Sequence, residues 1–95
     1  MKDLTELRAE IDKIDEELVA LFEKRMNTVV QVAEYKKANG LPVLNSGREQ
    51  VVLDKCCARL DNKEYSEAMT EWMKLTMALS RAAQEKYLEQ DTPAK

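Results

Sequence analysis

The first forty residues carry a hydrophobic pattern that predicts one long amphipathic helix. Apolar side chains recur three or four residues apart over most of this segment, which is the spacing of one face of an α-helix. They are Leu4, Leu7, Ile11, Ile14, Leu18, Leu21, Val29 and Val32. Asp3 with Glu6 is typical of a helix start, and Asn39 with Gly40 is typical of a helix end. We therefore predict a helix over residues 4–38, about 50 Å long.

Two further helices are predicted beyond the helix-breaking Pro42. The first covers residues 47–60, and Asp61-Asn62 prevents it from continuing. The second covers residues 63–89 and has its own apolar side. That side comprises Met69, Trp72, Met73, Leu75, Thr76 and Leu79. The pattern thus predicts an all-α fold with one long, one short and one medium helix, in a single domain of residues 1–95.

The composition supports this interpretation and limits the classes of function. Hydrophobic residues make up 44% of the 95 residues and charged residues 35%, with only two Gly and two Pro. The N-terminus has no apolar signal-peptide core, and no apolar run approaches the ~20 residues of a membrane span. We expect a cytoplasmic protein without membrane contact. Residues 90–95 fit either a chain end or the start of a linker to another domain.

The lack of histidine and the placement of the two cysteines limit the chemistry that the chain can perform. The chain has no histidine, the usual general base and metal ligand, and its net charge of −3 argues against a nucleic-acid surface. Cys56 and Cys57 are neighbours, so they do not pair readily and we interpret them as reduced packing thiols. We predict no metal and no cofactor.

The long helix is too long for a compact domain of this size. A globular chain of 95 residues has a radius of gyration near 12–13 Å, so a helix of about 50 Å projects from it. Its apolar stripe would be left in water unless a second chain covered it. We therefore predict a two-fold homodimer. A plain helical dimerisation module would explain the stripe equally well.

Polar side chains that interrupt the apolar faces are the candidate site residues. Arg25 and Lys36 continue the stripe of the first helix, and Arg8 lies at its edge. The complete inward polar set is Arg8, Arg25, Lys36, Arg48, Glu49, Ser80 and Gln84. Four cations face one carboxylate, so an external anion with at least two negative groups is the natural partner. Without a nucleophile or metal set, such a site suits a unimolecular reaction of a dicarboxylate.

Each of these residues also has a purely structural explanation. The cations can pair with acidic side chains of other helices or reach solvent. Glu49 can complete a capping box with Ser46, because the two have the S-x-x-E spacing. Ser80 and Gln84 can form hydrogen bonds between helices.

Taken together, the ordered motifs resemble the AroQ-class chorismate mutases over nearly the whole chain. The motifs are Leu7-Arg8-x-x-Ile11-Asp12-x-Ile14-Asp15, Leu21-Phe22-x-x-Arg25, Val32-Ala33-x-Tyr35-Lys36, Pro42-Val43, Arg48-Glu49 and Ser80-x-x-x-Gln84. The resemblance implies an intertwined homodimer of three-helix protomers. It implies the rearrangement of chorismate to prephenate in phenylalanine and tyrosine biosynthesis, without covalent catalysis.

The resemblance also implies roles for single residues. Arg8 of one chain would enter the site of the other chain, where it, Arg25 and Arg48 would hold the substrate carboxylates with help from Ser80. Lys36 and Gln84 would donate hydrogen bonds to the ether oxygen, and Glu49 would receive the ring hydroxyl. Charge grows on that oxygen as its bond to the ring breaks, so these donors bind the transition state best. The resemblance gives the catalytic residues as Lys36, Gln84 and Arg25.

One position departs from the family pattern, and two alternatives stay open. Asn45 stands where several relatives carry an acidic residue near the substrate hydroxyl, so its contact would be through the backbone or a neutral side chain. Isochorismate pyruvate lyase uses the same fold and a similar cationic site. Relatives also occur fused to prephenate dehydratase, prephenate dehydrogenase or an aldolase-type synthase.

Overall fold

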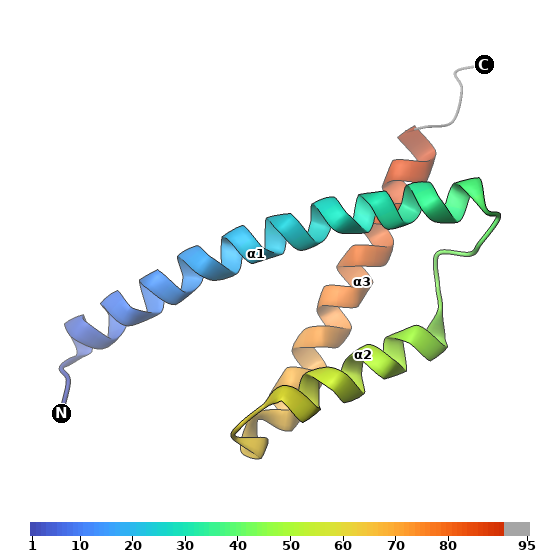
Figure 1. The fold of residues 1–95 in the computed structure, drawn as a ribbon. Helices are drawn as coiled ribbons and strands as arrows, with labels where there is room; N and C mark the ends of the chain where they lie inside the picture. Colours follow the sequence, from blue (N-terminus) through green and yellow to red (C-terminus); the bar gives the residue numbers. More distant parts are fainter. Residues whose placement is uncertain (91–95) are drawn as a thin grey trace.

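The computed structural model describes residues 1–90, which fold into three α-helices and one short 3-10 turn (Figure 1). The elements are α1 (Leu4–Ala38), α2 (Ser46–Arg59), η1 (Lys63–Tyr65) and α3 (Ser66–Gln90). These residues form no strand, so the predicted all-α fold with one long, one short and one medium helix is confirmed. Most of the C-terminal tail, residues 91–95, lies outside the described residues.

Both ends of α1 are fixed by local hydrogen bonds at the predicted residues. At the start, the Asp3 carboxylate accepts a hydrogen bond from the Glu6 backbone N–H at 2.9 Å. At the end, Gly40 has a φ of 65°. Its N–H bonds the Lys37 carbonyl at 3.4 Å, and the Leu41 N–H bonds the Lys36 carbonyl at 2.8 Å. This Schellman-type arrangement satisfies carbonyls that the helix leaves without partners.

The start of α2 excludes the capping box that was one of the alternatives for Glu49. Asn45 is the N-cap, and its side-chain oxygen accepts from the Arg48 N–H at 3.0 Å. Ser46 is already the first helical residue, so the capping box that Ser46 and Glu49 could have formed is not present. The reason is competition: asparagine is at least as good an N-cap as serine, and it precedes Ser46 by one residue. The Glu49 side chain is therefore available for other contacts.

The helices pack through α3, which contacts both α1 and α2. Figure 1 shows α3 crossing the C-terminal half of α1, while the N-terminal half of α1 projects away from the other helices. The most buried side chains gather at this crossing. They are Ala33, Met77, Ser80 and Gln84. Two of these four side chains are polar, so the centre of the fold contains groups that can form hydrogen bonds with a ligand.

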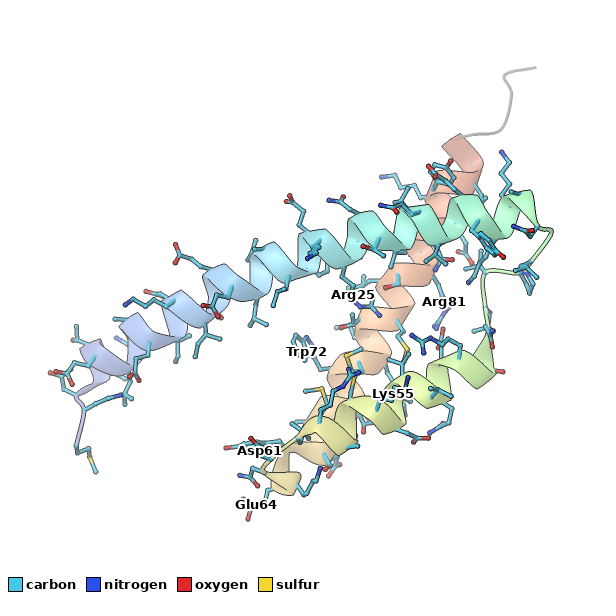
Figure 2. The ribbon with its side chains drawn as sticks, in the orientation of Figure 1. Arg25, Lys55, Asp61, Glu64, Trp72 and Arg81 are labelled. Atoms are coloured by element: carbon cyan, nitrogen blue, oxygen red, sulfur yellow. The ribbon has the colours of Figure 1, made fainter. Side chains whose placement is uncertain are left out.

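The projecting half of α1 leaves a long apolar stripe exposed. The stripe comprises Leu4, Leu7, Ile11, Ile14, Leu18 and Leu21. The radius of gyration is 17.1 Å, against about 12 Å for a compact domain of this length. An apolar groove between α1 and α3 continues the stripe. Leu18, Leu21, Phe22, Trp72, Met73, Leu75 and Leu79 line it, and Trp72 lies in the open angle between the two helices (Figure 2). A single chain thus leaves apolar surface uncovered.

Within the described part of the chain, no helix combines the length and apolar character that crossing a membrane requires.

The two glycines give a matched test of the helix ends. We expect Gly40→Ala to lower the free energy of unfolding by about 1 kcal/mol, because a Cβ is strained at its left-handed φ. Gly47→Ala should raise it by about 0.5 kcal/mol, because Gly47 lies in the first turn of α2 and its Cβ would meet only the Asn45 side chain at 3.5 Å. Urea unfolding at equal chain concentration measures both. Shifts of the same sign would contradict the account of these ends.

Candidate functional site

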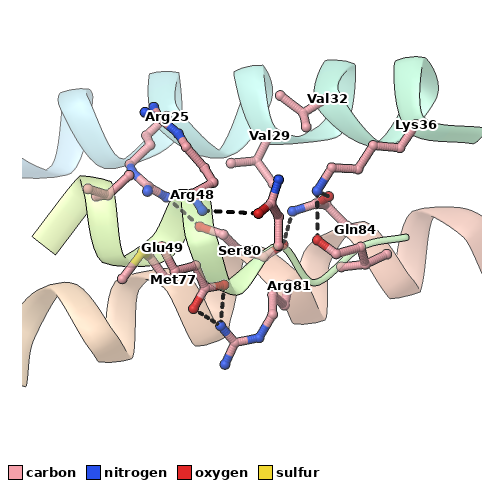
Figure 3. Close-up of a pocket in the computed structure, with 13 residues that line it drawn as sticks. Arg25, Val29, Val32, Lys36, Arg48, Glu49, Met77, Ser80, Arg81 and Gln84 are labelled. Carbon is pink, nitrogen blue, oxygen red and sulfur yellow. Dashed lines mark hydrogen bonds and ion pairs between the residues drawn. The ribbon is translucent and has the colours of Figure 1, made fainter. Parts of the chain in front are cut away.

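A pocket of about 160 Å³ opens where α1, α3, the α1–α2 connection and the first half of α2 meet (Figure 3). Its lining residues are Arg25, Val29, Val32, Lys36, Val43, Asn45, Arg48, Glu49, Val52, Met77, Ser80, Arg81 and Gln84. Every site residue predicted from the sequence lines this pocket except Arg8. The valines and Met77 form the apolar part of the wall, and charged or polar groups form the rest.

Arg25 lies at one side of the pocket, where α1 meets α3. Its Nη1 donates a hydrogen bond to the Ser80 Oγ, and that hydroxyl donates to the Thr76 carbonyl at 2.9 Å. Ser80 is buried, so its hydroxyl is held in one orientation by the helix that carries it. A guanidinium has five N–H donors, so the bond to Ser80 orients Arg25 and leaves donors for a ligand carboxylate.

Lys36 and Gln84 converge at the other side of the pocket. The Lys36 ammonium donates to the Val43 carbonyl at 2.6 Å and to the Gln84 Oε1 at 3.2 Å. The Gln84 Nε2 in turn donates to the Ser80 carbonyl at 3.4 Å. Lys36 is thus fixed between the loop and α3. An ammonium has three donors, so one remains for a ligand.

Glu49 and Arg81 form the ion pair that joins α2 to α3. The Arg81 Nη1 lies 2.6 Å from one Glu49 carboxylate oxygen and 2.5 Å from the other. Sequence reasoning missed Arg81. Its position, four residues after Met77 on the line that leads inward, could have indicated it. The Glu49 carboxylate thus pairs with Arg81 and does not cap α2.

The pocket concentrates positive charge in a chain that is acidic overall. Among the described residues that line it, the cations are Arg25, Lys36, Arg48 and Arg81, and the one carboxylate is that of Glu49. Four cations against one carboxylate leave an excess of three positive charges, whereas the whole chain carries −3. Such a cleft attracts a ligand with several negative groups.

Arg8 lies apart from this pocket. It is exposed on the projecting half of α1, 17 residues before Arg25 on the same helix, or about 25 Å along its axis. The helix keeps these two residues apart, so the chain cannot bring its own Arg8 into its own pocket. The predicted role of Arg8 therefore requires a second chain.

The remaining candidate groups play no part in this pocket. Both cysteines are free and neither lines this pocket, and the Cys57 thiol lies 3.3 Å from the Thr70 hydroxyl. Over residues 1–90, no three His, Cys, Asp or Glu side chains gather as metal ligands would. The groups that do line the pocket can bind, orient and polarise an anion.

Comparison with known proteins gives a family and several relatives. The family described as chorismate mutase type II matches residues 7–85. A chorismate mutase of Methanocaldococcus jannaschii is 30% identical over 93 residues, which cover 95% of this chain and 92% of the relative. The T-protein of Haemophilus influenzae is 45% identical over 53 residues, or 56% of this chain. A 4-amino-4-deoxychorismate mutase of Streptomyces venezuelae is 36% identical over 53 residues, 56% of this chain and 52% of that protein.

These relatives differ in how much of them the chain spans. The match covers only 14% of the length of the T-protein, in contrast to nearly all of the M. jannaschii protein. No solved structure is significantly similar to this chain.

The cap of α2 predicts different effects for two neighbouring residues. We expect Asn45→Ala to lower the free energy of unfolding by about 1 kcal/mol, because the Arg48 N–H loses its acceptor. Asn45→Asp should retain or raise stability, because a carboxylate also caps and is favoured at a helix N-terminus. Ser46→Ala serves as the control and should change little, since Ser46 is not the cap. Thermal and urea unfolding measure all three. A larger loss of unfolding free energy for Ser46→Ala than for Asn45→Ala would show that Ser46, and not Asn45, caps α2.

Proposed function

We propose that this chain, which belongs to the type II chorismate mutase family, is an isomerase that rearranges chorismate to prephenate in aromatic amino acid biosynthesis. The observation that carries the proposal is the pocket between α1 and α3. It has an excess of three positive charges, and its residues are those to which the family resemblance gives substrate contacts. Residues 1–95 would then hold one mutase domain.

The reaction itself explains why no nucleophile or base is needed. Chorismate carries two carboxylates, a ring hydroxyl and an enolpyruvyl ether. In the rearrangement the ether C–O bond breaks while a C–C bond forms within the same molecule, so no proton, atom or electron enters or leaves. A protein can accelerate such a step by holding the compact conformer of the substrate and by stabilising the charge that develops. We propose that neither a cofactor nor a metal takes part.

The carboxylates would bind to the arginines of the pocket. Arg25 is oriented by its hydrogen bond to Ser80, and Arg48 lies on the first turn of α2, at the same pocket. Guanidinium groups offer two parallel donors to a carboxylate, which fixes both position and orientation. Two carboxylates held in this way would restrain the substrate in the conformer that reacts.

The ether oxygen would lie between Lys36 and Gln84. The contact of 3.2 Å between these side chains supports this, because it brings both to one point of the pocket. Gln84 accepts from Lys36 in this arrangement, and a half-turn of its amide would present Nε2 to the ligand instead. Both groups would then donate to the oxygen on which negative charge grows, so they would bind the transition state better than the substrate.

The ring hydroxyl would donate to Glu49. The Glu49 carboxylate belongs to the same pocket and is paired with Arg81. A carboxylate has about four lone-pair directions, and two contacts to Arg81 leave acceptors for the hydroxyl. The Asn45 side chain is occupied by the cap of α2, which favours a backbone contact at that position.

We further propose that two chains form an intertwined homodimer in which each site is completed by Arg8 of the other chain. The exposed stripe of α1 and the apolar groove between α1 and α3 support this, because each would be covered by a second copy. The distance of Arg8 from its own pocket supports the exchange across the dimer. A cytoplasmic location stays a prediction.

The sharpest test of the mechanism is Lys36→Met. We expect the fold to be retained, because the change removes a cation from an apolar face at the cost of two hydrogen bonds. Loss of chorismate absorbance should slow by several orders of magnitude, as for loss of a contact made mainly in the transition state. Lys24→Met, an exposed lysine of the same helix outside the pocket, is the matched control.

Near-normal turnover in folded Lys36→Met would refute the role of Lys36. Release of pyruvate rather than formation of prephenate by the unchanged protein would favour the lyase over the mutase.

The dimer and its shared sites can be tested by complementation. Arg8→Ala and Arg25→Ala chains should each be inactive alone, because every site then lacks one arginine. In a heterodimer one site lacks both arginines and the other lacks neither. After equal mixing and exchange, we expect about a quarter of wild-type activity, because half of the dimers would carry one intact site of two. Light scattering should give about twice the chain mass of 10.9 kDa.

Subunit exchange is followed separately with a tagged chain. Demonstrated exchange without recovered activity would mean that Arg8 does not act in the partner's site.

A further inference from the structure

We propose that Arg81 determines which ring substituent the pocket accepts, by neutralising Glu49 so that it receives a neutral hydroxyl rather than a cationic amine. The inference rests on the proposed function, since it concerns the same site. Arg81 is a positioning residue in this account, because it acts through Glu49 rather than on the reacting atoms.

Arg81 and Glu49 form a close ion pair beside the pocket. One nitrogen of Arg81, Nη1, lies within 2.6 Å of both Glu49 carboxylate oxygens. The two side chains are partly buried, with exposed fractions of 32% for Arg81 and 25% for Glu49. Figure 3 shows the Glu49 carboxylate directed at the Arg81 guanidinium, on the side of the pocket away from Lys36. Arg81 thus offsets the negative charge of this carboxylate and fixes its orientation.

The net charge of the Glu49–Arg81 pair affects which ligand groups it can bind. Among the described residues lining the pocket, Glu49 alone could attract a cationic group of a ligand. With Arg81 beside it, the pair has no net charge, and an incoming cation would meet an arginine at close range. A neutral hydroxyl meets no such repulsion and needs only a free lone pair on the carboxylate. The pair therefore favours a hydroxyl over a protonated amine.

The two ring substituents under comparison, a hydroxyl and an amine, differ in charge. Chorismate carries a hydroxyl on its ring, whereas 4-amino-4-deoxychorismate, the compound in the name of the S. venezuelae relative, carries an amine in its place. An amine of this kind is protonated near neutral pH and carries a positive charge. The choice between these compounds is thus a choice between a neutral and a charged group at the position that Glu49 would face.

A purely structural role for Arg81 makes a different prediction. The pair separates the pocket from a second cavity on the other side, which Glu49, Met77 and Arg81 also line. If Arg81 served only to join α2 to α3, its removal would slow the conversion of both substrates by the same factor. Partly exposed ion pairs contribute little to stability. A change in the ratio of the two substrates is therefore the informative measurement.

The experiment compares kcat/KM for chorismate and for 4-amino-4-deoxychorismate. We expect Arg81→Met to move the ratio toward the amino compound by about tenfold, because the unpaired Glu49 carboxylate then attracts the ammonium. Arg81→Lys should keep a ratio close to that of the wild type. Lys74→Met is the matched control, because Lys74 lies on the same helix beside the second cavity but outside the pocket. It removes the same charge and should leave the ratio unchanged.

Glu49→Gln gives an independent test, in which the ratio of the two kcat/KM values should move in the opposite direction. Arg81 is then unpaired, so the ratio should move further toward chorismate, whatever the effect on total rate. In the double variant Arg81→Met with Glu49→Gln, the shift caused by Arg81→Met alone should disappear. Circular dichroism checks the fold of each variant.

The outcomes separate the two proposals. A wild-type protein that converts chorismate, with an unchanged ratio in folded Arg81→Met or a shift equal to that of Lys74→Met, overturns the role of Arg81 and leaves the mutase intact. If Arg81→Met does not fold, Glu49→Gln decides, and a ratio moving toward the amino compound overturns the inference. A wild-type protein that converts neither compound overturns the proposed function, and the role of Arg81 with it.

Discussion

Positive charge gathered at the crossing of α1 and α3 is the constraint on which the rest of the structure depends. Arg25 and Lys36 occupy positions that would otherwise continue the apolar face of α1. Partly buried cations need partners, and α3 supplies Ser80 to one and Gln84 to the other. These are neutral partners, so they orient the cations without cancelling their charge. The site stays positive because the helix that packs against it carries hydroxyl and amide groups rather than carboxylates.

The same constraint explains the pairing of Glu49, the one carboxylate among the described residues that line the pocket. A free Glu49 would be drawn to the cations of the pocket and would reduce the charge available to a ligand. Arg81 holds it through two contacts on the α3 side instead. The correction at the start of α2 belongs to this arrangement. Because Asn45 caps the helix, the Glu49 side chain is not used in a capping box and can reach α3.

Local chemistry made much of the fold predictable from the sequence. The spacing of apolar residues, the N-cap Asp3 and the left-handed Gly40 after the C-cap define α1, since each acts within a few residues of itself. The inward polar set was likewise visible as breaks in helical periodicity. Arg81 lies on the same inward line as Met77, but its pairing with Glu49 could not be predicted. An arginine at the edge of an apolar face usually reaches solvent, and this pairing depends on how α2 packs against α3. Competition between Asn45 and Ser46 for the cap was also beyond pattern matching, because both residues are good caps.

The length of α1 connects folding with function. A shorter helix would suffice for the crossing with α3, and the projecting half adds an apolar stripe that a single chain leaves in water. That half also carries Arg8, which is too far along the helix to reach its own pocket. Association of two chains would cover the stripe and deliver a further cation to each site in one event. The hydrophobic burial that drives association would then offset the repulsion of adding positive charge to a pocket already in excess by three. Each site would then hold one more cation than a single chain places in its own pocket.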